Sequence, residues 1–196
     1  MGHSVSGTPA DAHAVTVPES GIPFTDVSAA DSFYDDVEYV YKSGIMNGVS
    51  DDRFDPYSTL TRGMVVTILH RLEGTTDIFF RGVLDDVEPG IWYSEAVEWA
   101  AAEMIVNGYG DGLFGPNDPV TSEQLAAILY RYADYKGYMT DAADPVPGRY
   151  SSWAEECVRW AVVNEVIPID GTYMRPAKRF EVAGAISAFC RLYDVS

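Results

Sequence analysis

Shifting the chain by 60 residues aligns its first third with its second without a gap, and this internal repeat constrains the fold more than any other feature. The matching positions combine glycine, proline, acidic and apolar residues: Asp26 with Asp86, Asn47-Gly48 with Asn107-Gly108, Phe54 with Phe114, Pro56 with Pro116, and Thr61 with Thr121. Because a separate domain of about 50 residues buries only a marginal core, we expect the copies to pack into one unit.

A third, weaker copy follows at a shift of 61, where Trp153 and Trp160 match Trp92 and Trp99. The sequence therefore predicts three copies, at 24–74, 84–137 and 148–194. Residues 1–23 are rich in Ser, Gly, Pro and Ala and lack the pattern of a signal peptide, which indicates a flexible leader or an artificial end.

Each copy is expected to form helix, loop and helix, so the predicted fold class is mostly α with pseudo-threefold repetition around a central bundle. First helices carry one apolar stripe, as at Phe33, Val37 and Val40. The loops are dense in Gly, Asp and Pro, with one aromatic residue, Phe54 or Phe114, as an expected anchor.

Several local signals predict where the helices begin and end. Second helices are predicted to begin at Thr61, at Thr121 and near Lys178. The pairs Ser32–Asp35 and Ser152–Glu155 have the spacing of capping boxes at the first helices. Gly44, Gly74 and Gly137 are predicted helix stops.

Charge and composition exclude several function classes. The formal net charge of −17 disfavours nucleic acid and anionic membranes as partners. Residues 149–196 hold six bases and six acids, so the acidic excess lies earlier in the chain. The chain has no run of about 18 apolar residues, so no membrane span is predicted. Cys157 and Cys190 fit either a disulfide or two buried thiols.

The ordered motifs resemble the S-layer homology domain over about residues 24–194. They are Phe24-Thr25-Asp26-Val27, Gly44-Ile45-Met46-Asn47-Gly48, Asp111-Gly112-Leu113-Phe114-Gly115-Pro116 and, as variants of Thr-Arg-Ala-Glu, Thr61-Arg62-Gly63-Met64, Thr121-Ser122-Glu123-Gln124 and Lys178-Arg179-Phe180-Glu181. The resemblance implies a helical unit whose grooves between copies bind a pyruvylated secondary cell-wall polysaccharide, or a related peptidoglycan-linked glycopolymer, at a bacterial surface of Gram-positive type.

The resemblance also suggests roles for residues of this chain. Arg62 and Arg179 would clamp the carboxylate together with free helix N–H groups, with Thr61 beside Arg62 and Lys178 assisting Arg179. The loop residues Asn47, Gly48, Asn107 and Gly108 would line the sugar subsites, and Gln124 and Glu181 would accept hydrogen bonds from hydroxyls. An aromatic platform is expected from Trp92, Trp99 or Trp160.

The strongest site is expected beside the third copy and the next near Arg62, while the groove around Ser122 is expected to be silent because Ser122 replaces the arginine. No cofactor, metal site or catalytic residue is predicted: the Asp-rich loops do not fit a calcium loop, and His70 has no partner suggested by the sequence. The alternative is a degenerate unit that serves as a protein-interaction or structural module, with neighbouring surface-layer domains as partners.

Overall fold

The computed structural model describes residues 21–75, 78–138, 140–141 and 145–195. Over these ranges it contains six α-helices, one short 3-10 helix and no β-strand. The first helices are α1 (Tyr34–Lys42), α3 (Ser94–Ala102) and α5 (Glu155–Val163), and η1 (Ser152–Ala154) leads into α5. The second helices are α2 (Arg62–Glu73), α4 (Ser122–Tyr135) and α6 (Arg179–Leu192). The mostly helical fold predicted from the repeat is thus confirmed.

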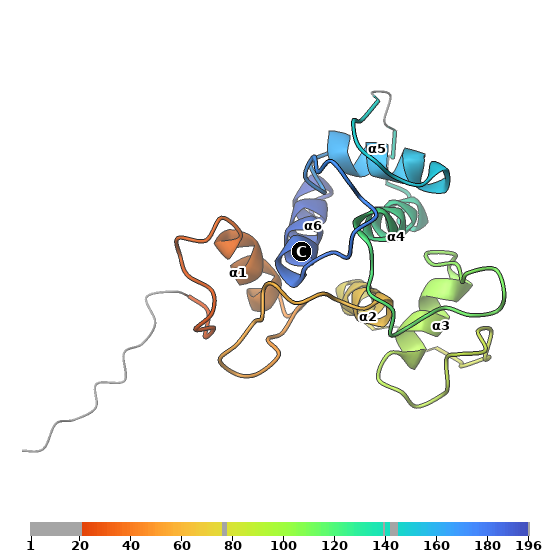
Figure 1. Cartoon of the computed structure of the whole chain (residues 1–196). Helices are drawn as coiled ribbons and strands as arrows, with labels where there is room; N and C mark the ends of the chain where they lie inside the picture. The colour runs from red at the N-terminus through yellow and green to blue at the C-terminus, as the bar shows by residue number, and fades with distance from the viewer. Residues whose placement is uncertain (1–20, 76–77, 139, 142–144, 196) are drawn as a thin grey trace, which may run out of the picture.

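The helices pair between copies rather than mainly within them. α2 packs against α3, α4 against α5, and α6 returns to pack against α1, so the three pairs close into a ring. In Figure 1, α2, α4 and α6 lie toward the centre, and α1, α3 and α5 lie outside them. Each first helix therefore covers a second helix from the neighbouring copy.

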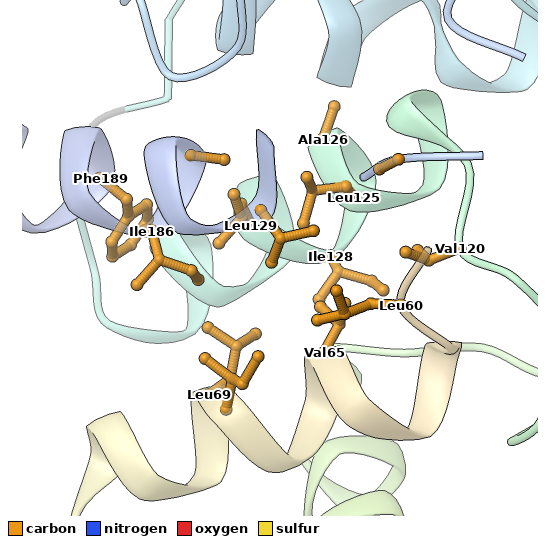
Figure 2. Close-up of a cluster of buried hydrophobic side chains, with 14 of the residues drawn as sticks. Leu60, Val65, Leu69, Val120, Leu125, Ala126, Ile128, Leu129, Ile186 and Phe189 are labelled. Carbon is orange, nitrogen blue, oxygen red and sulfur yellow. The ribbon is translucent and has the colours of Figure 1, made fainter. Parts of the chain in front are cut away.

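A central apolar cluster joins the three inner helices. Val65 and Leu69 of α2 meet side chains of α4 and α6, among them Leu129 and Phe189 (Figure 2). All of these side chains are buried, and they belong to one continuous core. Since each inner helix supplies a share, no copy encloses this core alone.

The N-termini of the inner helices are held by the loops of neighbouring copies. In α2, the N–H groups of Arg62 and Gly63 donate to the carbonyls of Asp118 (2.9 Å) and Pro116 (2.9 Å). The equivalent donors are Ser122 and Glu123 of α4, which bond Arg175 and Tyr173, and Arg179 and Phe180 of α6, which bond Ser58 and Pro56. The expectation that these N–H groups would be free to bind an anion is wrong, because they donate to backbone carbonyls of the neighbouring copies.

Caps explain most helix ends. Thr61 and Thr121 cap α2 and α4 as predicted, each accepting from the third residue of its helix, and Gly74 ends α2 with φ 92°. The capping boxes predicted at Ser32 and Ser152 are absent. α1 begins after Phe33 and α5 after Ala154, with no side-chain cap at either N-terminus, because the chain enters both through tight turns.

Three further observations concern the N-terminal segment and the two cysteines. Residues 1–20 of the predicted leader lie outside the described residues. Ile22, also assigned to the leader, is only 2% exposed and belongs to the core. Cys157 and Cys190 are free, buried thiols.

Candidate ligand-binding grooves

Three grooves follow the pseudo-threefold repetition, and two of them are built alike. Groove A, of about 340 Å³, lies between the first loop, α2 and Trp92. Groove B, of about 500 Å³, lies between the second loop, α4 and Trp153. Their linings correspond residue by residue: Asn47 with Asn107, Gly48 with Gly108, Ile68 with Ile128, Arg71 with Arg131, Trp92 with Trp153, and Arg179 with Arg62.

The motif arginines occupy the loop side of each groove and are largely engaged by backbone. Arg62 is 5% exposed; its Nε donates to the Phe114 carbonyl (2.8 Å) and a terminal nitrogen donates to the Asn107 carbonyl (3.2 Å). Its guanidinium also stacks on the rings of Phe114 (4.5 Å) and Tyr109 (4.8 Å). Burial lowers the pKa of Arg62, so its charge is held in a desolvated place.

Arg179 repeats this arrangement in groove A. It donates to the Asn47 carbonyl and stacks on Phe54 at 4.7 Å, and burial lowers the pKa of its guanidinium too. Its Nε is buried without a hydrogen-bond partner among the described residues. A ligand acceptor in groove A would relieve that unsatisfied donor.

Sequence reasoning missed a second arginine in each groove. Arg71 of α2 and Arg131 of α4 line grooves A and B from the helix side. Within the described parts of the chain, neither guanidinium has a hydrogen bond or an ion pair. Their positive charges reach the motif arginines, because Arg71 lowers the pKa of Arg179 and Arg131 that of Arg62, each adding to the effect of burial. The signal was available, since Arg71 aligns with Arg131 at the 60-residue shift.

The loop residues act through their backbone. The carbonyls of Asn47 and Asn107 accept from the motif arginines, as described above. Gly48 and Gly108 are required by close packing: a Cβ at Gly48 would lie 2.4 Å from the Ser50 carbonyl oxygen, and one at Gly108 would lie 2.5 Å from that of Leu113. These glycines let the loop fold back on itself beside each groove.

An exposed tryptophan flanks groove A and another flanks groove B. Trp92 is 57% exposed at groove A, and Trp153 is 53% exposed at groove B. Trp99 and Trp160 are completely buried in the core, so the suggestion that they form a sugar platform is wrong. Both belong to the apolar stripes of α3 and α5, which face inward, whereas Trp92 and Trp153 precede those helices.

The remaining predicted site residues are divided among different places. Gln124 lines groove B, although its Oε1 accepts the Thr121 N–H (3.1 Å) in a capping box. Thr61 accepts the Met64 N–H (3.3 Å) as the cap of α2. Lys178 lies outside the grooves, with its Nζ 5.7 Å from the centre of the Tyr57 ring. Glu181 lies away from grooves A and B, paired with Arg175 through both carboxylate oxygens (2.6 and 2.9 Å).

The third groove, groove C, has different chemistry. It measures about 570 Å³ and lies between the third loop, α6 and α1. Pro168 and Ile169 replace the Asn-Gly pair, Ala188 replaces the helix arginine, and Ser32 replaces the tryptophan. Ser122, in place of the motif arginine, lines a closed space of about 10 Å³ beside Arg175. Groove C does contain Arg191, which is paired with Asp36, and the rings of Phe33 and Phe180, but it has no cationic or aromatic residue at the positions that grooves A and B share.

The described residues also bear on metal binding and membrane insertion. They contain no group of three or more His, Cys, Asp or Glu side chains placed to hold a metal ion. No helix in the described ranges has both the length and the apolar character needed to cross a membrane.

Comparison with known proteins matches this architecture. Residues 23–63 and 85–126 match the family model of the S-layer homology domain, so the fold is the helical fold of such repeats. The chain is 33% identical over half its length to an amylopullulanase of Thermoanaerobacterium thermosulfurigenes, and 27% identical over 67% of its length to a surface-layer 125 kDa protein of Lysinibacillus sphaericus. It is 22% identical over 62% of its length to a cellulosome-anchoring protein of Acetivibrio thermocellus.

The chain spans only a small part of these relatives. It covers 5% of the amylopullulanase, 11% of the surface-layer protein and 29% of the cellulosome-anchoring protein. What is shared is thus a segment within longer proteins.

Proposed function

We propose that this chain is a non-catalytic cell-surface anchoring module that binds an anionic, pyruvylated secondary cell-wall polysaccharide without forming a covalent bond. The observation that carries the proposal is the residue-by-residue equivalence of grooves A and B, each with two arginines and an exposed tryptophan. Relatives named for surface layers and for anchoring support the assignment to a bacterial cell surface, and we extend it to a Gram-positive type of wall.

The proposed contacts follow from the free groups in each groove. Arg71 and Arg131 supply unengaged guanidiniums that bind the carboxylate of a ketal in bidentate fashion. Arg62 and Arg179 hold the loops and add positive charge at the far wall, and the Asn47 and Asn107 side chains meet sugar hydroxyls. Trp92 and Trp153 pack on the apolar face of a pyranose ring.

We further propose that residues 148–194 form a third repeat of the same family. Support comes from α5 and α6, which complete the ring by packing on α4 and α1, and from the backbone bonds that α6 makes to the first loop. The degenerate loop of this repeat, at Pro168 and Ile169, lines groove C, whereas its motif arginine, Arg179, lines groove A.

The test is co-sedimentation with cell-wall sacculi that carry, or lack, pyruvylated polymer. We expect sedimentation only with the pyruvylated walls and its loss in the Arg71→Gln, Arg131→Gln double variant. The matched control is Arg159→Gln, which removes a charge paired with Glu155 on α5, outside grooves A and B. Equal sedimentation with both kinds of wall would overturn the proposed specificity.

A protein-interaction role is the second candidate, and groove C favours it. Ile169 and Val163 are exposed at its rim, and it has none of the sugar-binding groups of the other grooves. Retention by a surface-layer subunit in the absence of polysaccharide, lost on Ile169→Asp, would support this candidate.

A further inference from the structure

Grooves A and B share two arginines and a tryptophan but differ at two helix positions in their linings. Met64 of groove A stands where groove B has Gln124, and Thr67 stands where groove B has Ala127. Groove A is also the smaller of the two, at about 340 Å³ against about 500 Å³. Two otherwise equivalent sites thus present different surfaces to a bound sugar.

Four apolar side chains contribute to the lining of groove A. Met46, Leu60, Met64 and Ile68 line it, and the hydroxyl of Thr67 is already engaged, donating to the Gly63 carbonyl (2.8 Å). A sugar hydroxyl placed against Met64 would lose its bonds to water and gain no strong partner, which costs binding free energy. A methyl group at the same place would instead be removed from water at no polar cost.

Groove B has more hydrogen-bonding groups in its lining. The Nε2 of Gln124 is available because only the Oε1 serves the helix cap. The Tyr109 hydroxyl donates to Asp118 (2.8 Å) and keeps lone pairs to accept a further bond. Glu123 also lines groove B, its carboxylate held by Ser151, so its negative charge offsets part of the arginine charge there.

We propose that the two grooves select different sugar substituents, with residues 64 and 124 setting the difference. Groove A takes an anionic sugar that carries a methyl-bearing acetal or acyl group, and that methyl packs on Met64. Groove B takes a hydroxyl-rich anionic sugar, to which Gln124 donates a hydrogen bond. Its preference for anionic over neutral sugars is weaker than that of groove A. This inference rests on the proposed polysaccharide-binding function and adds a division of labour to it.

The experiment reads one groove at a time. Arg131→Gln disables groove B and leaves groove A; Arg71→Gln does the reverse. Each protein is titrated calorimetrically with two probes: the methyl glycoside of an N-acetylhexosamine bearing a carboxyethylidene acetal, and methyl glucuronide. We expect groove A to prefer the acetal by about tenfold, the equivalent of one well-placed polar mismatch, and groove B to prefer it by less than about twofold.

Exchange variants then test the two named residues. Met64→Gln in the groove A protein is expected to bring its preference near that of groove B, and Gln124→Met in the groove B protein to raise it. The second variant should fold, because α2 already has Met64 at this position with only the Thr61 cap. Equal preferences in both grooves, or preferences unmoved by the exchange, would overturn this inference alone. Failure of the acetal probe to bind any of the proteins would overturn the proposed function as well.

Discussion

The two pairs of arginines in the grooves have different roles, although all four side chains are cationic. Arg62 and Arg179 join the loops to the inner helices through carbonyl bonds and ring stacking, while Arg71 and Arg131 have no partner among the described residues. A substitution at the first pair should therefore change stability, and one at the second pair should change binding.

We predict that Arg62→Met lowers the free energy of unfolding by about 2 kcal/mol, since the Phe114 and Asn107 carbonyls lose a buried donor. Urea denaturation followed by circular dichroism measures the change. Arg131→Gln, in the same groove, serves as the control and should stay within about 0.5 kcal/mol of the wild type. Equal stability of the two variants would contradict the structural role given to Arg62.

A second residue-scale prediction concerns pH and Glu181. Burial by itself would raise the pKa of Glu181, but Arg175 and the Lys178 N–H outweigh it and hold the pKa below its ordinary value. A lowered folded pKa means that the stabilisation is fully present above the unfolded value of about 4.3 and is lost as pH falls through the folded value. Glu181→Gln should cost about 2 kcal/mol at pH 7 and less at pH 3. Thermal unfolding at both pH values checks this, and an equal loss at each would contradict it.

At the scale of elements, each loop depends on a glycine where its backbone turns against itself. Gly108→Ala should destabilise the protein by more than about 2 kcal/mol, because the added Cβ meets the Leu113 carbonyl. Gly171→Ala in the third loop is the matched control, since nothing lies within 4 Å of a Cβ there, and it should be close to neutral. Differential scanning calorimetry compares the two; similar melting temperatures would refute the close-packing explanation.

The limits of the inner helices could be predicted from the sequence, whereas the partners of the helices could not. Thr61, Thr121 and Gly74 carry their signals locally, so the limits of the inner helices were predictable, and the repeat placed Phe54 and Phe114 as buried loop anchors. Partner choice among helices was not, because the stripes of α1, α3 and α5 suit any inner helix. The engagement of Arg62 by carbonyls was also hidden, since backbone acceptors have no sequence signature.

At the scale of the whole molecule, the closing pair of α6 and α1 makes the three copies one structure. The central cluster draws side chains from all three inner helices, and Arg191 of α6 pairs with Asp36 of α1 at 2.7 Å. We predict a single unfolding transition whose calorimetric and van 't Hoff enthalpies agree. Val37→Ala, a buried change in α1, should lower the free energy of unfolding by about 2 kcal/mol and move the whole transition to lower temperature. Separate transitions for the copies would contradict the ring.

The distribution of charge over the whole molecule explains how a chain of net charge −17 can hold an anion. Grooves A and B each concentrate two guanidiniums, and groove C has no arginine at the equivalent positions. The number of anionic sugars bound per chain is therefore the most direct measurement. Isothermal titration with the methyl glycoside of a pyruvylated hexosamine should give two sites of unequal affinity, falling to one in Arg71→Gln or Arg131→Gln and to none in the double variant. Three sites, or two sites that survive the double substitution, would contradict the account.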